Sequence, residues 1–137
     1  MYISETYVRV KYSETDQMGY VYYGNYAEYY EVGRAEALRE LGLSYKKLEE
    51  CGYMTPVYEM KIRYNRPARY DDLLKIVTKI VKIEGVRFYF EYEIYNERGE
   101  NINNGSTLMF FVRKKDGRPV KPPLWFVEKI NAYIEVC

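Results

Sequence analysis

Hydrophobic and polar residues alternate in several segments of the chain, as they do in strands with one buried face. In residues 57–64, VYEMKIRY, the even positions are apolar, while Glu59, Lys61 and Arg63 are charged. Later runs are rich in β-branched and aromatic residues and are separated by short turns with glycine, so they predict hairpins. The expected strands cover residues 4–12, 57–64, 71–83, 86–96 and 102–114.

A period of three to four residues over 25–42, NYAEYYEVGRAEALRELG, predicts one long helix. Asn25 is placed to cap its start, and Glu28 follows three residues later as in a capping box. Gly42 supplies the C-terminal stop. The helix also carries small residues that let a sheet pack close to its axis, and these are Ala27, Gly33, Ala35 and Ala37.

Two shorter segments also have helical patterns. Residues 44–52, SYKKLEECG, predict a brief second helix. Residues 122–136, PPLWFVEKINAYIEV, begin with two prolines and predict a short amphipathic helix anchored by Trp125, Ile130 and Tyr133.

The predicted order is one strand, a long helix, four antiparallel strands and a terminal helix. This order is typical of an α+β fold, in which an antiparallel sheet buries a helix on one face. Gly105, inside the last strand, predicts a bulge or a close backbone approach. The length of 137 residues predicts a single domain, residues 1–137.

Charge and composition exclude several classes of partner. The chain has 21 Lys plus Arg and 20 Asp plus Glu, so it lacks the basic excess that binds nucleic acid or a membrane surface. Stacking of nucleic-acid bases on the 18 tyrosines therefore ranks last among the hypotheses. No apolar run is long enough for a membrane span, and Cys51 and Cys137 lack disulfide or metal spacing. We expect a cytoplasmic protein.

The chain contains no histidine, so acid or base chemistry falls to carboxylates, Lys, Tyr or Cys. Asp16 is the most suggestive carboxylate, because it precedes a helix start in SETDQMGYVYYGNY, residues 13–26. Free N–H groups at a helix start can hold an oxyanion, and a nearby carboxylate can attack an acyl carbon or activate water. D-x-x-G is also a common turn, so both roles stay open on spacing alone.

A resemblance adds to this reading. The run DQMGYVYYGNY, residues 16–26, resembles the D-x-x-G-h-V-x-x-x-x-Y signature of hotdog-fold acyl-CoA thioesterases, specifically the 4-hydroxybenzoyl-CoA thioesterase family and its Tol-Pal-associated branch. YYEVGRAEALRELG and RYNRPARYDDLL are similar to the family's helix and to its second-to-third strand junction. The likeness therefore extends over nearly the whole chain.

The resemblance implies a five-stranded antiparallel sheet of order 1-3-4-5-2 wrapped around a long central helix, and a homodimer or homotetramer. It implies that Asp16 is the catalytic carboxylate and that the backbone N–H of Tyr23 polarises a thioester carbonyl. It also implies that the reaction uses no metal or cofactor. The Tol-Pal branch often has His at this position, so the acyl group stays open. The expected substrate site also includes Gly19, Tyr22, Gly24, Asn25 and Tyr26.

Three functions remain open from the sequence. The first is hydrolysis of an acyl-CoA to a free acid and CoA. The second is the same reaction on an acyl group carried by acyl carrier protein. The third is a noncatalytic hotdog module that binds an acyl ligand or a protein. For an enzyme, the sequence also leaves open whether Asp16 attacks directly or through water.

Overall fold

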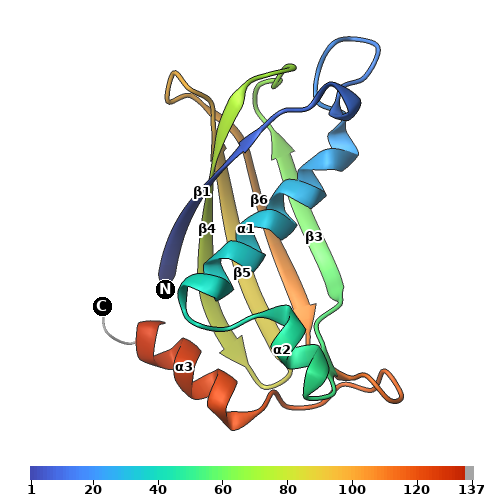
Figure 1. Ribbon diagram of the computed structural model, residues 1–137, viewed down its shortest axis with the longest axis vertical. Coiled ribbons are helices and arrows are strands. Elements are labelled where there is room, and N and C mark those ends of the chain that lie inside the picture. The colour runs from blue at the N-terminus through green and yellow to red at the C-terminus, as the bar shows by residue number, and fades with distance from the viewer. Residues whose placement is uncertain (135–137) are drawn as a thin grey trace.

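A computed structural model describes residues 1–134, so Cys137 lies outside the described part of the chain. One antiparallel sheet wraps around the long helix α1, which crosses one of its faces (Figure 1). No helix within residues 1–134 is long and apolar enough to cross a membrane.

Five strands form this sheet in the order β1-β4-β5-β6-β3. In chain order of the long strands this is 1-3-4-5-2, so the expected topology is confirmed. A second, two-stranded sheet pairs β2 with β7, and the sequence pattern had not indicated it. The strands are β1 Tyr2–Arg9, β2 Tyr53–Met54, β3 Val57–Tyr64, β4 Leu73–Glu84, β5 Arg87–Tyr95, β6 Asn101–Phe110 and β7 Val112–Arg113.

The helices also follow the predicted segments. A 3-10 turn, Tyr23–Asn25, leads directly into α1, Tyr26–Glu40, which ends where Gly42 adopts φ +76°. The helix α2, Tyr45–Glu50, begins after Ser44, whose hydroxyl accepts from the N–H of Lys47 at 3.1 Å. The terminal helix α3 covers Leu124–Ile134.

The helix α1 lies unusually close to the sheet at Gly33. A Cβ on Gly33 would lie 3.0 Å from Ile76 Cγ2 and in direct collision with Thr78 Oγ1, both on β4. Small residues in the helix therefore let the sheet approach, as the sequence indicated.

A second close approach joins α1 to the middle of the sheet. The ring of Tyr30 stacks on that of Tyr92 at 4.1 Å, and its hydroxyl donates to Asn103 Oδ1. Tyr30 fits only because Gly105 has no side chain, since a Cβ there would lie 2.6 Å from Tyr30 Cε2 and 2.7 Å from Lys61 O. The predicted close backbone approach at Gly105 is confirmed.

The predicted anchors of α3 are partly wrong. Ile130 is buried as expected, but Trp125 and Tyr133 are 37% and 42% exposed. Phe126 is the second buried residue of α3, and its ring contacts those of Phe88 and Phe111. Trp125 and Phe126 are neighbours in the sequence, and either could have been the buried anchor. Which of them faces the core depends on the orientation in which α3 packs against the sheet.

The strand β3 has a strong alternation, but of its apolar positions only Ile62 is partly buried and packs against the core. It lies at the edge of the sheet, and its apolar residues Tyr58, Met60 and Tyr64 are all at least 40% exposed. Exposed apolar residues on an edge strand are available for contact with another chain.

We expect Gly105→Ala to lower the free energy of unfolding by about 1–3 kcal/mol, because the added methyl collides with the Tyr30 ring and with rigid backbone. Chemical denaturation measures this change. Ser106→Ala, at the next position of β6, serves as the control and should cost less than about 0.5 kcal/mol. Equal effects of the two substitutions would contradict the role of Gly105.

Candidate active site

The segment between β1 and α1 forms a tight turn that starts at Asp16. The N–H of Gly19 donates to the carbonyl of Asp16 at 3.0 Å, and the N–H of Asp16 donates to the carbonyl of Tyr20 at 2.8 Å. Gly19 adopts φ +79°, which residues with a side chain rarely tolerate. The turn therefore depends on glycine at this position.

The two oxygens of the Asp16 carboxylate have different environments. Its Oδ1 accepts hydrogen bonds from the N–H groups of Met18 at 3.0 Å and Tyr20 at 3.2 Å. Its Oδ2 has no hydrogen-bond partner within residues 1–134. One oxygen thus stabilises the turn, while the other is available for a ligand or a water molecule.

The 3-10 turn that precedes α1 presents free backbone donors. Among the described residues, the N–H groups of Tyr23 and Gly24 donate to no acceptor. Such groups carry the partial positive charge of a helix start and favour an oxygen with negative charge. The turn is held in place by the Tyr64 hydroxyl of β3, which donates to the carbonyl of Tyr23 at 3.1 Å.

One cavity of about 270 Å³ brings these groups together. Asp16 and Tyr23 both line it, as does Tyr26 at the start of α1. The opposite wall comes from the end of β3 and the junction that follows it. The other aromatic and charged residues that line the cavity are Tyr20, Tyr64 and Arg66.

The remaining residues predicted for the site do not line this cavity. Gly19 closes the turn, while the ring of Tyr22 lies against that of Tyr23, tilted by 39° with the centroids 4.5 Å apart. Gly24 makes room for the Tyr22 ring, because a Cβ there would lie 2.7 Å from Tyr22 Cε2. Gly19, Tyr22 and Gly24 therefore contribute to the backbone conformation on either side of Tyr23.

Asn25 does not cap α1, and the predicted capping box is wrong. Its backbone is already helical, with φ −73° and ψ −17°, and its side chain accepts no hydrogen bond from the N–H groups of the first turn. The amide instead donates through Nδ2 to the carbonyl of Glu14 at 2.8 Å, and that carbonyl also accepts from the N–H of Tyr22. Asn25 therefore ties the start of α1 to the segment that carries Asp16.

Tyr26 and Tyr64, in the cavity wall, remain protonated near neutral pH. Burial raises the pKa of Tyr26 to about 12. Burial, together with the neighbouring Tyr23, also raises the pKa of Tyr64. These phenols can donate hydrogen bonds but cannot serve as bases, so Asp16 is the carboxylate in the cavity wall that can do so.

No group of three or more Cys, Asp or Glu side chains is placed to hold a metal ion in the part of the chain that the structure describes. Asp16 lies in the wall of the cavity without a second acidic side chain beside it in that wall. The polar groups at this site are the carboxylate, the free N–H groups, the phenols and the side chains of Asn65 and Arg66.

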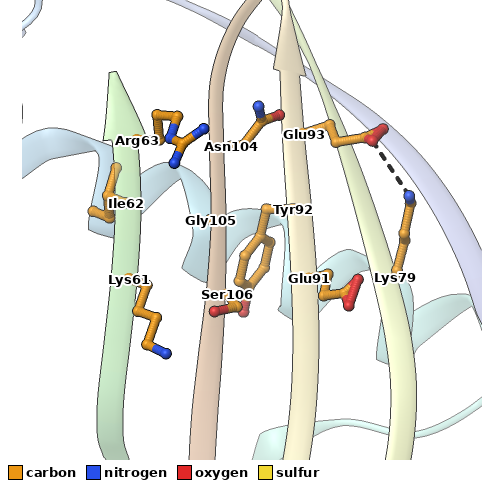
Figure 2. Close-up of a pocket in the computed structure, with 10 residues that line it drawn as sticks. All are labelled: Lys61, Ile62, Arg63, Lys79, Glu91, Tyr92, Glu93, Asn104, Gly105 and Ser106. Carbon is orange, nitrogen blue, oxygen red and sulfur yellow. Dashed lines mark hydrogen bonds and ion pairs between the residues drawn. The ribbon is translucent and has the colours of Figure 1, made fainter. Parts of the chain in front are cut away.

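A larger hollow of about 520 Å³ lies elsewhere, on the open face of the sheet (Figure 2). Its charged side chains come from β3, β4 and β5, and α1 passes behind the strands in this view. Lys79 and Glu93 pair there at 3.3 Å. The hollow contains no free backbone donors of a helix start, so we assign the candidate site to the smaller cavity that holds Asp16.

The sequence reasoning missed several residues of the cavity wall. Tyr64, Asn65, Arg66 and Pro67 lie in the RYNRPARY segment, far from Asp16 in the chain. That segment was noted only for its likeness to the family's second-to-third strand junction, and the structure places its three arginines in different surroundings. Arg66 lines the cavity and pairs with Glu100 at 3.2 Å, whereas Arg69 lies over the Tyr20 ring and Arg63 lines the hollow of Figure 2. Met18, Tyr20 and Val21 complete the set that was missed.

Comparisons with known proteins place this chain in a family. Residues 18–103 match the model of the Thioesterase superfamily. The putative acyl-CoA thioesterase YneP of Bacillus subtilis is 34% identical over 133 residues, which are 97% of this chain and 96% of that protein. The chain belongs to the thioesterase superfamily.

Further relatives of this thioesterase agree with that result. The acyl-CoA thioester hydrolase YbgC of Escherichia coli is 35% identical over 105 residues, which are 77% of this chain and 78% of that protein. The crystal structure of DHNA-CoA thioesterase from Staphylococcus aureus superposes with a TM-score of 0.92 at 34% identity, over 99% of this chain and 91% of that one.

The comparisons confirm the hotdog fold and the thioesterase family that the sequence motifs had indicated. The Tol-Pal-associated branch stays a prediction. The family match begins at Met18, two residues after Asp16, so it carries no information on Asp16. The roles of Asp16 and Tyr23 stay predictions from the family resemblance, and the structure places both residues in the wall of one cavity.

We expect Asn25→Asp to lower the free energy of unfolding by about 1–2 kcal/mol, because the carboxylate cannot donate to the carbonyl of Glu14. If Asn25 were an N-cap, aspartate would replace it at little cost. Ser44→Asp at the true N-cap of α2 is the matched control and should change stability by less than about 0.5 kcal/mol. Thermal unfolding of both variants separates the two roles. An Asn25→Asp variant with unchanged stability would support the capping interpretation.

Proposed function

We propose that this thioesterase hydrolyses the thioester bond of an acyl-CoA, with Asp16 as the catalytic carboxylate and the Tyr23 N–H as the oxyanion donor. The observation that carries the proposal is that Asp16, whose Oδ2 has no hydrogen-bond partner among the described residues, and Tyr23, whose N–H donates to none of them, both line one cavity. The names of the relatives YneP and YbgC, each described as acting on acyl-CoA, support the substrate class.

The N–H groups at the start of α1 would act on the thioester carbonyl. Negative charge develops on that oxygen as the carbon becomes tetrahedral, so a donor fixed in advance stabilises the transition state more than the ground state. Tyr23 N–H and Gly24 N–H are both free to donate. The Tyr64 hydroxyl donates to the carbonyl of Tyr23 and so holds the backbone of this turn in position.

Asp16 would supply the attacking oxygen in one of two ways. As a general base, Oδ2 takes a proton from water, the hydroxide oxygen bonds to the acyl carbon, and the C–S bond breaks to release the CoA thiolate. As a nucleophile, Oδ2 bonds to the acyl carbon itself, the thiolate leaves, and water then hydrolyses the mixed anhydride. Both routes give a free acid and CoA, and the hydrogen bonds to Oδ1 orient the carboxylate in either case.

We expect Asp16→Asn to lower kcat for acyl-CoA hydrolysis by about 100-fold or more, because the amide can neither take a proton nor attack. The side-chain oxygen of asparagine can still accept from Met18 and Tyr20, so the turn should persist. Release of free thiol from benzoyl-CoA, hexanoyl-CoA and palmitoyl-CoA measures the rate.

Asp71→Asn is the matched control, because Asp71 is an exposed loop residue outside the cavity and the chemical change is the same. This control should retain the rate of the unchanged protein within about twofold. An Asp16→Asn variant as fast as the control would contradict the assignment of Asp16.

Two alternatives predict other outcomes of the same assays. An acyl-acyl carrier protein thioesterase would release thiol from the carrier-bound acyl group much faster than from CoA. A noncatalytic acyl-binding module would bind acyl-CoA in calorimetry without releasing thiol. The cytoplasmic location stays a prediction, which cell fractionation tests.

We also propose that the enzyme works as a homodimer joined through β3, with a homotetramer of two such dimers as the larger possibility. The support is the exposed apolar edge of β3, where Tyr58 stacks on Phe110 at 4.4 Å and remains 67% exposed. The same strand ends at Tyr64, which lines the Asp16 cavity. Pairing at this edge would therefore place the partner close to the site.

We expect Met60→Lys to shift the protein toward the monomer in analytical ultracentrifugation, because the two-fold axis of a β3 pair brings the new charges near each other. Ile3→Lys on β1, the opposite edge of the sheet, is the control and should leave the dimer intact. If Ile3→Lys dissociates the dimer and Met60→Lys does not, the interface lies at the other edge.

A further inference from the structure

The side chain of Glu14 joins the segment that carries Asp16 to the helix α1. Its Oε1 accepts hydrogen bonds from the N–H of Lys11 at 2.8 Å and from the hydroxyl of Tyr29 at 3.0 Å. The first bond closes the short 3-10 turn Tyr12–Glu14. The second bond reaches α1 itself, because Tyr29 lies in the first turn of that helix. One carboxylate oxygen therefore connects two elements that are distant in the chain.

The main chain of Glu14 makes a second pair of contacts with the same region. Its carbonyl accepts from the N–H of Tyr22 at 2.8 Å and from Nδ2 of Asn25 at 2.8 Å. Tyr22 directly precedes the 3-10 turn Tyr23–Asn25, and Asn25 ends it. The residue two positions before Asp16 thus contacts both sides of the turn that presents the free N–H of Tyr23.

The donor in the contact with α1 is a buried phenol. Tyr29 is 3% exposed, and its ring meets that of Tyr26 edge-on with the centroids 5.7 Å apart. Burial raises the pKa of Tyr29, and the negative charge of Glu14 raises it further. The phenol therefore stays protonated and donates to Glu14. A buried hydroxyl without an acceptor is costly, so this contact is maintained in the folded protein.

Neither partner of this hydrogen bond is placed to touch a substrate. Glu14 and Tyr29 do not line the cavity that holds Asp16 and Tyr23. An effect on the reaction would therefore act through the position of other groups. Such effects are large, because a displacement of about 1 Å in a reacting group can lower a rate by about 100-fold.

We propose that Glu14, held by Tyr29, is a positioning residue for Asp16. Its role is to set where the free oxygen of the Asp16 carboxylate lies relative to the N–H of Tyr23. Asn25 fixes the main chain of Glu14 at the start of α1, while Tyr29 fixes its side chain further along the helix. The inference rests on the proposed function, because it assumes that Asp16 and Tyr23 act on the same thioester.

The first test is Glu14→Ala, assayed with the acyl-CoA of the panel above that is hydrolysed fastest. We expect kcat to fall by about 10- to 100-fold while KM changes by less than about twofold, because the cavity wall itself is intact. Glu28→Ala is the matched control, since Glu28 is an exposed carboxylate in the first turn of α1. It should keep kcat within about twofold. An unchanged kcat in Glu14→Ala, or a change in KM alone, would overturn the proposal.

Two conservative variants separate the hydrogen bond from the charge. Glu14→Gln keeps an acceptor oxygen at the same reach, so kcat should stay within about threefold of the unchanged protein. Glu14→Asp keeps the charge but is one methylene shorter and cannot span the same contact, so kcat should fall by at least about tenfold. The reverse order, with Glu14→Asp active and Glu14→Gln inactive, would make Glu14 a catalytic carboxylate and reject the positioning role.

Two neighbouring tyrosines decide the matter even if Glu14→Ala does not fold. Tyr29→Phe and Tyr30→Phe each remove one hydroxyl and keep the ring, but Tyr29 donates to Glu14 whereas Tyr30 donates to Asn103 in the core. Tyr29→Phe should lower kcat by about three- to tenfold, and Tyr30→Phe should keep it within about twofold. Equal kcat values in the two variants would contradict the proposal, whatever their melting temperatures.

A double variant distinguishes failure of this inference from failure of the proposed function. Adding Glu14→Ala to Asp16→Asn should lower the residual rate by less than about twofold, because the carboxylate that Glu14 positions is already absent. A full effect in that background would show that Glu14 acts independently of Asp16 and would overturn the inference. A fully active Asp16→Asn would instead overturn the proposed function. An inactive Asp16→Asn beside a fully active Glu14→Ala would reject the positioning role alone.

Discussion

The packing of α1 into the sheet at glycine positions is the constraint on which the rest of the structure depends. Gly33 admits the side chains of β4, and Gly105 admits the ring of Tyr30, so the helix is fixed both along and across the strands. The start of α1 then lies beside the end of β3, where the Tyr64 hydroxyl holds the carbonyl of Tyr23. The proposed oxyanion donor is therefore positioned by the core and not only by its loop.

The loop before α1 combines a structural role and the proposed catalytic role in one side chain. Asp16 uses one oxygen to close its own turn and leaves the other without a protein partner. Asn25 then ties this segment to the helix start through the carbonyl of Glu14. Asp16 can therefore be both a turn residue and the proposed catalytic residue, because the hydrogen bonds that close the turn also orient its free oxygen.

The sequence predicted the features that depend on local pattern. Alternation located the long strands, helical periodicity located α1, and Gly105 was recognised as a close approach. The sequence could not predict contacts that depend on how distant segments meet. The donation from Asn25 to Glu14, the burial of Phe126 and the cavity wall formed by Tyr64 each require the tertiary structure. The role of Asp16 came from family resemblance, since its spacing fits a turn equally well.

The most direct test of the account follows the backbone N–H of Tyr23 by ¹⁵N NMR during titration with S-phenacyl-CoA. This ketone keeps the acyl carbonyl but has no thioester bond to hydrolyse. If the carbonyl accepts from the start of α1, the Tyr23 amide proton moves downfield as the hydrogen bond forms, and Gly24 moves with it. Binding of the ketone with shifts confined to residues away from Tyr23 and Gly24 would contradict the central claim that this turn receives the reacting oxygen.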